Sequence, residues 1–269
     1  MRLFDPHCHM YCRLTDDYEQ MALCGITTIV EPAFWLGTNR THPESFFDYF
    51  EHITEFERKR AARYGINHYQ CIGVNPKDAK NLEVTLPTVE GMRHFFDRPS
   101  VVGVGEIGLD DNLDEEMQGL EVQLDLAQEL GIPALVHTPH VDKKRGVEMI
   151  AELIKGKSYN NELIEIDHIT EETIGIVRDL GVWVAMTVYP VTKLSPDRAV
   201  AMVEKHGMER MLVNSSVDWG ESDPLSIPRV VRLMRQKGYK ESEISQLVWR
   251  NPVKFWGQSG RITELEIVE

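Results

Sequence analysis

The chain has few cysteines and no long apolar run. Its 269 residues include four cysteines, Cys8, Cys12, Cys24 and Cys71, and no C-x-x-C pair. This pattern is typical of reduced thiols in a cytosolic protein, not of a disulfide framework. No apolar stretch has the length needed to cross a bilayer, and the first residues lack the basic start and apolar stretch of a signal peptide. We therefore expect a cytoplasmic protein without membrane contact.

The chain also lacks a basic excess. It has 29 lysines and arginines against 43 aspartates and glutamates, a formal net charge of −14. This charge argues against tight, sequence-independent binding of nucleic acid through a basic surface. It leaves a nucleic-acid or small-molecule phosphoester open as a substrate, because bound divalent cations can supply local positive charge. The sequence does not determine the oligomeric state.

Eight strand-length apolar runs alternate with amphipathic stretches that have helical spacing. The runs are 2–5, 25–32, 68–74, 101–107, 134–137, 163–168, 182–188 and 211–217, and the clearest helical stretches are 46–64, 115–130, 147–154 and 199–206. Eight strand–helix units predict parallel pairing and right-handed crossovers, hence an α/β fold of the (β/α)₈ TIM-barrel class. An open doubly wound sheet is the structural alternative. Without a linker, repeat or low-complexity tract, residues 1–269 are expected to form one domain.

Histidines and acidic residues recur where the expected strands end, which is where the active sites of such barrels lie. His7 and His9 form an H-x-H pair, and alternation along a strand predicts that they point the same way. The full set is His7, His9, Glu106, His137, His168 and Asp218. Four imidazoles and two carboxylates would then converge on one mouth of the barrel.

Alternation also predicts which residues face the barrel interior. Val102 and Val104 should share a face with Glu106, and Ile164 and Ile166 should share a face with His168. A buried cluster of imidazoles and carboxylates is costly without a partner, and divalent metal removes that cost. Six such ligands fit two ions about 3.5–4 Å apart that are bridged by a carboxylate. Nitrogen and oxygen donors favour Zn²⁺ here, with Mn²⁺, Fe²⁺ and Mg²⁺ as alternatives.

With these positions in view, the chain resembles the TatD-like metal-dependent hydrolases of the amidohydrolase superfamily over essentially its whole length. Asp5, His7 and His9 match the D-x-H-x-H strand that opens the family, and residues 105–110 (G-E-I-G-L-D) match its fourth-strand motif. The histidines of strands five and six correspond to His137 and His168, and the family's C-terminal asparagine and phenylalanine to Asn251 and Phe255. The resemblance implies a two-metal hydrolase acting on phosphodiester bonds of DNA.

Three departures from the family pattern bear on the substrate. Asn75 occupies the position of a strand-three histidine, and the arginine that follows the strand-five histidine is missing. The E-T-D-x-P motif of strand eight is replaced by residues 214–218 (N-S-S-V-D), where an ungapped alignment puts Ser216 at the aspartate position. Asp218 preserves the strand face and is our expected ligand, with Asp223 as the alternative. A preserved metal shell with an altered pocket predicts the same chemistry on a different substrate.

In the expected mechanism, His7 and His9 bind one metal, His137 and His168 bind the other, and Glu106 bridges them. Asp218 would bind the first metal and accept the proton of a metal-activated water that attacks a phosphoester or related bond. Asn75, Asp110, His140 and Trp219 are candidate substrate contacts. Two alternatives stay open: an amidohydrolase-type enzyme cleaving a C–N or C–O bond in a small metabolite, and a non-catalytic metal-binding barrel in a biosynthetic complex.

Overall fold

The computed structural model describes residues 1–262 and contains eight parallel strands in one sheet, ordered β1 to β8 along the chain. The strands are β1 (Leu3–Asp5), β2 (Ile26–Pro32), β3 (Asn67–Ile72), β4 (Val101–Gly108), β5 (Ala134–His137), β6 (Ile164–Ile166), β7 (Trp183–Thr187) and β8 (Met211–Asn214). Hydrogen bonds from Ser216 N to His7 O (2.8 Å) and from His9 N to Val217 O (2.7 Å) join the chain beyond β8 to the chain beyond β1. These bonds bring the sheet round into a nearly closed (β/α)₈ barrel, as predicted.

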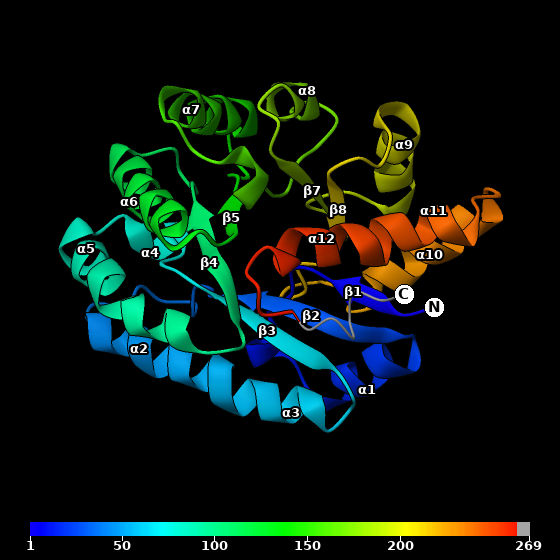
Figure 1. The fold of residues 1–269 in the computed structure, drawn as a ribbon, viewed down its shortest axis with the longest axis horizontal. Helices are drawn as coiled ribbons and strands as arrows, with labels where there is room; N and C mark the ends of the chain where they lie inside the picture. The colour runs from blue at the N-terminus through cyan, green and yellow to red at the C-terminus, as the bar shows by residue number, and fades with distance from the viewer. Residues whose placement is uncertain (263–269) are drawn as a thin grey trace.

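Helices surround the strands (Figure 1). They are α1 (Thr15–Leu23), α2 (Pro43–Glu51), α3 (Arg58–Ala62), α4 (Pro76–Ala79), α5 (Leu82–Gly91), α6 (Asp114–Leu130), α7 (Lys143–Gly156), α8 (Ile174–Arg178), α9 (Pro196–His206), α10 (Ser226–Gln236), α11 (Glu241–Ser245) and α12 (Asn251–Gly257). Their ends follow local sequence rules: Ser195 Oγ accepts from Arg198 N at the start of α9, and Gly131 takes φ +64° after α6, a conformation that glycine adopts without steric cost. None of the helices within residues 1–262 combines the length and apolarity that crossing a bilayer requires.

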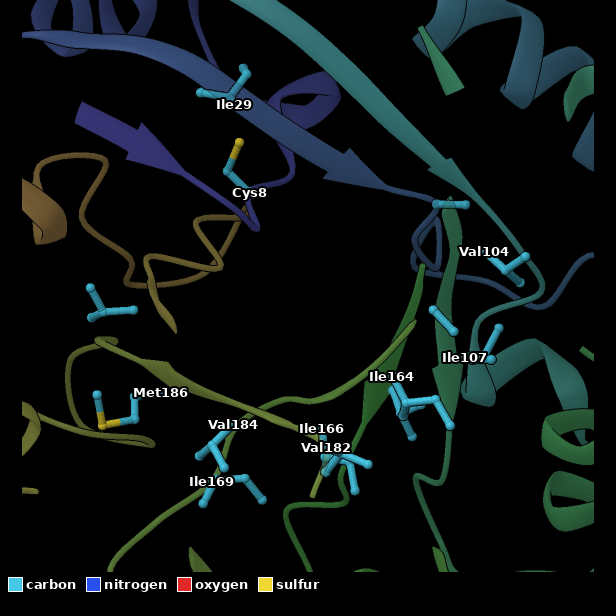
Figure 2. Packing of buried hydrophobic residues seen from close by; sticks show 14 of the residues in the cluster. Cys8, Ile29, Val104, Ile107, Ile164, Ile166, Ile169, Val182, Val184 and Met186 are labelled. Atoms are coloured by element: carbon cyan, nitrogen blue, oxygen red, sulfur yellow. The ribbon is translucent and has the colours of Figure 1, made fainter. Parts of the chain in front are cut away.

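Two buried clusters separate the outside of the barrel from its inside. The larger cluster lies between strands and helices, and Figure 2 shows part of it, including Ile164, Ile166 and Val104. The smaller cluster lies inside and takes residues from the strands and from α12: Phe4, Val30, Cys71, Val102, Leu135, Trp183, Ala185, Leu212, Phe255 and Trp256. Since Ile164 and Ile166 point outward, alternation turns Glu165 inward, beside its register partners Leu135 and Trp183.

The prediction that Ile164 and Ile166 share the interior face with His168 is therefore wrong. β6 ends at Ile166, and His168 takes φ +58°, so the strand alternation no longer applies when the chain reaches the histidine. The prediction that Val104 shares the interior face with Val102 and Glu106 is also wrong, because Val104 packs in the outer cluster whereas Val102 packs inside. The register of β4 shifts against β3 between Val101 and Gly103, and against β5 between Val104 and Ile107. These two irregularities break the alternation on both sides of Val104, ahead of Glu106.

Candidate metal centre

The predicted histidines meet just beyond the ends of the strands, around Glu106. His7 Nε2 lies 2.9 Å from His9 Nε2, and each of these nitrogens is 3.9 Å from a Glu106 oxygen. His137 Nδ1 is 2.7 Å and His168 Nε2 is 3.4 Å from Glu106 Oε1. All five side chains are buried, with exposed fractions of at most 7%. The structure thus brings together five of the six residues that the sequence singled out as metal ligands.

The donor set fits a divalent metal. Nitrogen and oxygen ligands bind zinc at about 2.0–2.2 Å, so two donors that subtend an angle of about 90–110° at one ion lie roughly 2.8–3.6 Å apart. The His7–His9 and His168–Glu106 distances fall in this range. His9 Nδ1 is buried without a hydrogen-bond partner in the described part of the chain. His7, Glu106 and His168 also offer ligand atoms that all lie within 4.8 Å of one another.

Glu106 is held as a carboxylate in this cluster. Burial raises its pKa, but His137, His168 and His7 outweigh burial and hold the pKa well below its usual range. Burial lowers the pKa of His9 and of His168, so both imidazoles are neutral at physiological pH. Neutral imidazoles beside an ionised carboxylate are the protonation states that bind a metal.

Asp167 is a buried carboxylate behind the histidines. Its Oδ2 accepts from His7 Nδ1 at 2.5 Å, which leaves His7 Nε2 directed at His9 and Glu106. Its Oδ1 accepts from His168 N (2.6 Å), Thr187 Oγ1 (3.1 Å) and Asn214 Nδ2 (3.0 Å). Carboxylates that orient metal-binding histidines in this way are common around metal sites. Asp167 lies within the predicted strand 163–168 but was not among the predicted site residues.

Neither candidate acid of strand eight reaches the five residues. Asp218 Oδ1 accepts from Tyr189 Oη (2.8 Å) and Gly220 N (2.7 Å), and within residues 1–262 no hydrogen bond or ion pair joins it to the cluster. Asp223 pairs with Arg229 and accepts from Leu225 N near the start of α10. Ser216 comes closer, because its Oγ accepts from Lys193 Nζ at 3.3 Å.

Lys193 is a member of the site that the sequence analysis missed. It follows β7, and its Nζ lies 3.2 Å from His168 Nε2, the nitrogen that faces Glu106. The turn that carries it is closed by Lys193 N donating to Tyr189 O and Tyr189 N donating to Leu194 O. Burial lowers the pKa of Lys193, and Asp167 and Glu106 oppose that shift. Lys193 thus contacts Ser216, the residue at the position where the family pattern has an aspartate.

The four candidate substrate contacts lie in different settings. Asn75 donates to Glu106 Oε2 at 2.9 Å and so orients this carboxylate. Asp110 is paired with Lys77 and Lys80. His140 lines a cavity of about 600 Å³ beside Lys193. Trp219 is 44% exposed.

An aromatic wall borders the metal ligands on the side of β2. We use this term for Phe34, Trp35 and Trp219. Phe34 stacks on His9 with ring centroids 3.9 Å apart, and Trp219 packs against Phe34 (5.3 Å) and Trp35 (5.8 Å). This arrangement places Trp219 beside the site, where it could contact a substrate.

Comparison with known proteins agrees with this geometry. The family described as TatD related DNase matches residues 4–257. A protein of Methanocaldococcus jannaschii described as an uncharacterized metal-dependent hydrolase is 30% identical over 255 residues, which cover 94% of this chain and 99% of that protein. A TatD-like protein of Archaeoglobus fulgidus has a TM-score of 0.77 and 26% identity, with 94% and 99% of the two chains covered. A lactonase of Listeria monocytogenes shares the fold alone, with a TM-score of 0.64, 14% identity and coverage of 95% and 94%.

Proposed function

The chain belongs to the TatD related DNase family and is a metal-dependent hydrolase, and from this premise we propose that it cleaves a phosphoester or related anionic bond at a centre of two divalent ions. His7 and His9 would hold one ion, His137 and His168 the other, and Glu106 would bridge them. When bound, the ions lower the pKa of water towards neutrality and polarise the scissile bond. Imidazole and carboxylate donors suit Zn²⁺, and equally accept Mn²⁺ or Fe²⁺.

The convergence of four imidazoles on Glu106 carries this proposal. The protein's own residues fix that arrangement: Asp167 holds His7, Thr187 Oγ1 contacts His168 Nδ1 at 2.6 Å, and Asn75 holds Glu106. Side chains locked in this way need little reorganisation when substrate enters, which is how fixed dipoles and charges contribute most to catalysis.

The buried charges favour an anionic substrate. The pKa values of Glu106 and Asp167 are held well below their usual range, so both groups are carboxylates. Two divalent ions bring four positive charges against these two negative ones, so the metal-loaded centre would be cationic. A cationic, buried centre attracts an anionic ester more strongly than a neutral amide.

Asp218 lies at the cavity wall in this proposal, held by Tyr189. If it leaves Tyr189 to act as the proton acceptor, Asp218→Asn will lose most of the turnover while the bound metal is kept. Turnover of Asp218→Asn within tenfold of the parent protein would assign proton transfer to another group.

A matched substrate panel tests the function. Metal-reconstituted protein is assayed on a phosphodiester, a phosphomonoester, a lactone and an amide, with metal content measured in parallel. Glu106→Ala should lose metal and turnover together, whereas Glu165→Gln, which alters another buried glutamate of the barrel, should keep both. Turnover of the lactone or amide but of neither phosphoester would refute the phosphoester assignment, and a Glu106→Ala protein that keeps metal and rate would refute the site.

A further inference from the structure

Lys193 has hydrogen-bonding capacity that the described protein does not fill. An ammonium has three N–H donors, and Lys193 Nζ has two polar neighbours, His168 Nε2 and Ser216 Oγ. The first is a nitrogen that a metal would take. No carboxylate within residues 1–262 forms an ion pair with Lys193, whose remaining close contact is the Tyr189 ring, 5.2 Å from Nζ.

Lys193 is also part of a cavity wall. Lys193 lines the space of about 600 Å³ that lies between the loop after β7 and the loop after β8, with His140 on the same side as the metal ligands. Its volume is typical of a small-molecule site. The centroid of His140 is 6.3 Å from that of His168, so the cavity adjoins the metal centre.

Two acids also line this cavity. They are Asp218 and Glu221, and Asp218 is held there by Tyr189 and Gly220. The cavity therefore offers one cation, close to His168, and two acids. A ligand with one anionic group and an otherwise uncharged or cationic body matches this set of charges.

Other cations that follow the strands have partners within the protein, and among them Lys143 has no carboxylate partner in residues 1–262 but donates to Thr138 O and Oγ1. Lys80 contacts Asp110 (3.0 Å) and Asp111 (2.5 Å), and Arg40 contacts Asp78 at 2.6 Å. Nucleic-acid binding proteins commonly neutralise about six to ten phosphates. Two lysines without a carboxylate partner among residues 1–262, Lys193 and Lys143, on a chain of net charge −14, do not provide such a track.

We infer that Lys193 binds an anionic oxygen of the substrate beside the metal centre, and that the substrate is a small phosphoester with an uncharged or cationic body, not a nucleic-acid strand. This inference rests on the proposed function and names the substrate class of the same site. Ser216 orients Lys193 Nζ, and Asp218 and Glu221 disfavour ligands with further negative charges.

The test compares Lys193→Met, Lys193→Arg and Lys143→Met in the metal-loaded protein. Lys143 is the matched control, because it also follows a strand but donates to Thr138. Binding of inorganic phosphate is measured by calorimetry, and kcat and KM are measured on a small phosphodiester and on a single-stranded oligonucleotide. Metal content is determined for each variant.

Lys193→Met should weaken phosphate binding and raise KM by about 10- to 100-fold, the loss expected for one charge-assisted hydrogen bond, with metal content unchanged. Lys193→Arg should recover most of this loss, and Lys143→Met should stay near the parent values. Glu221→Lys should improve cleavage of the oligonucleotide by removing repulsion.

Two results would overturn the inference while leaving the metal centre intact: unchanged phosphate binding by Lys193→Met, or a higher kcat/KM on the oligonucleotide than on the small ester. Loss of metal from Lys193→Met would also refute it, because Lys193 would then act through the metal site. Failure of the proposed function is seen separately, as Glu106→Ala that retains metal and rate.

Discussion

The substitution Asp167→Asn should abolish tight metal binding although it changes one atom. Three donors, from His168 N, Thr187 and Asn214, point at Oδ1. An asparagine must therefore keep its carbonyl oxygen on that side, and its amide nitrogen then faces His7 Nδ1, which is 2.5 Å from Oδ2 in the parent protein.

The consequence is a change of tautomer. An amide donor makes His7 Nδ1 the acceptor, so the ring proton moves to Nε2, the nitrogen that lies 2.9 Å from His9 Nε2. A protonated Nε2 cannot bind a metal. Removal of a partner that orients a metal-binding histidine typically costs 10- to 100-fold in affinity. We expect the upper end, about 100-fold or about 2.7 kcal/mol, because the orientation of the amide is enforced.

The assay is a Zn²⁺ titration of chelator-stripped protein by calorimetry, with thermal unfolding in chelator as the check on folding. Glu165→Gln is the control, since it makes the same chemical change two residues earlier on the interior face without touching His7. A Zn²⁺ affinity of Asp167→Asn within threefold of the parent value would refute the tautomer argument.

Three further outcomes follow from contacts elsewhere in the barrel. Burial and Asp167 hold the pKa of Glu165 well above its usual range, so the folded protein keeps this group protonated and loses stability as pH rises from the unfolded pKa of about 4.3. The melting temperature of Glu165→Gln minus that of the parent protein should therefore be larger at pH 8 than at pH 5. An equal difference at both pH values would contradict this. A Cβ at Gly103 would lie 2.6 Å from Pro133 O and 2.8 Å from Trp256, so Gly103→Ala should lower the free energy of unfolding by about 1–3 kcal/mol in urea titrations, whereas Gly156→Ala, with open space around it, should not. Asn75→Asp would place a second carboxylate against Glu106 Oε2, now 2.9 Å from the Asn75 amide, and should shift the acidic limb of the kcat/KM profile to higher pH; an unmoved limb would show that Asn75 does not control Glu106.

The sequence predicted the barrel and the convergence of five side chains because these depend on short-range rules. Apolar runs and helical spacing set the eight units, and the active-site end of a parallel barrel is fixed by topology. Three of the histidines, His7, His9 and His137, lie within a few residues of a strand end. Their positions can therefore be predicted once the end of the strand is known. The C-terminal resemblance also has a physical basis: Asn251 donates to Met208 O and Met211 O at 2.7 Å, and Phe255 fills the barrel interior.

Prediction failed where the backbone leaves the strand. His168 reaches the cluster through a positive φ, not through alternation with Ile164 and Ile166. Ser216 likewise has φ +43°, so counting strand positions from Asn214 does not say which side chain faces the metals. Asp218 lies two residues further on and turns towards Tyr189.

Lys193 shows why a search for polar residues at predicted strand ends does not find a site residue that lies on a loop. β7 ends at Thr187, and the chain turns back so that Val188 bridges Leu194 and Lys193 is returned to the mouth of the barrel. No periodicity fixes such a turn. The sequence feature that could have pointed to Lys193 is the loss of a negative charge at Ser216, where the family has an aspartate. A centre without that carboxylate can hold a lysine nearby that forms no ion pair. A site with serine and lysine in place of an aspartate has less negative charge beside the proposed metal centre, so the change that obscured the family motif is also the one that, under our proposal, favours an anionic ligand.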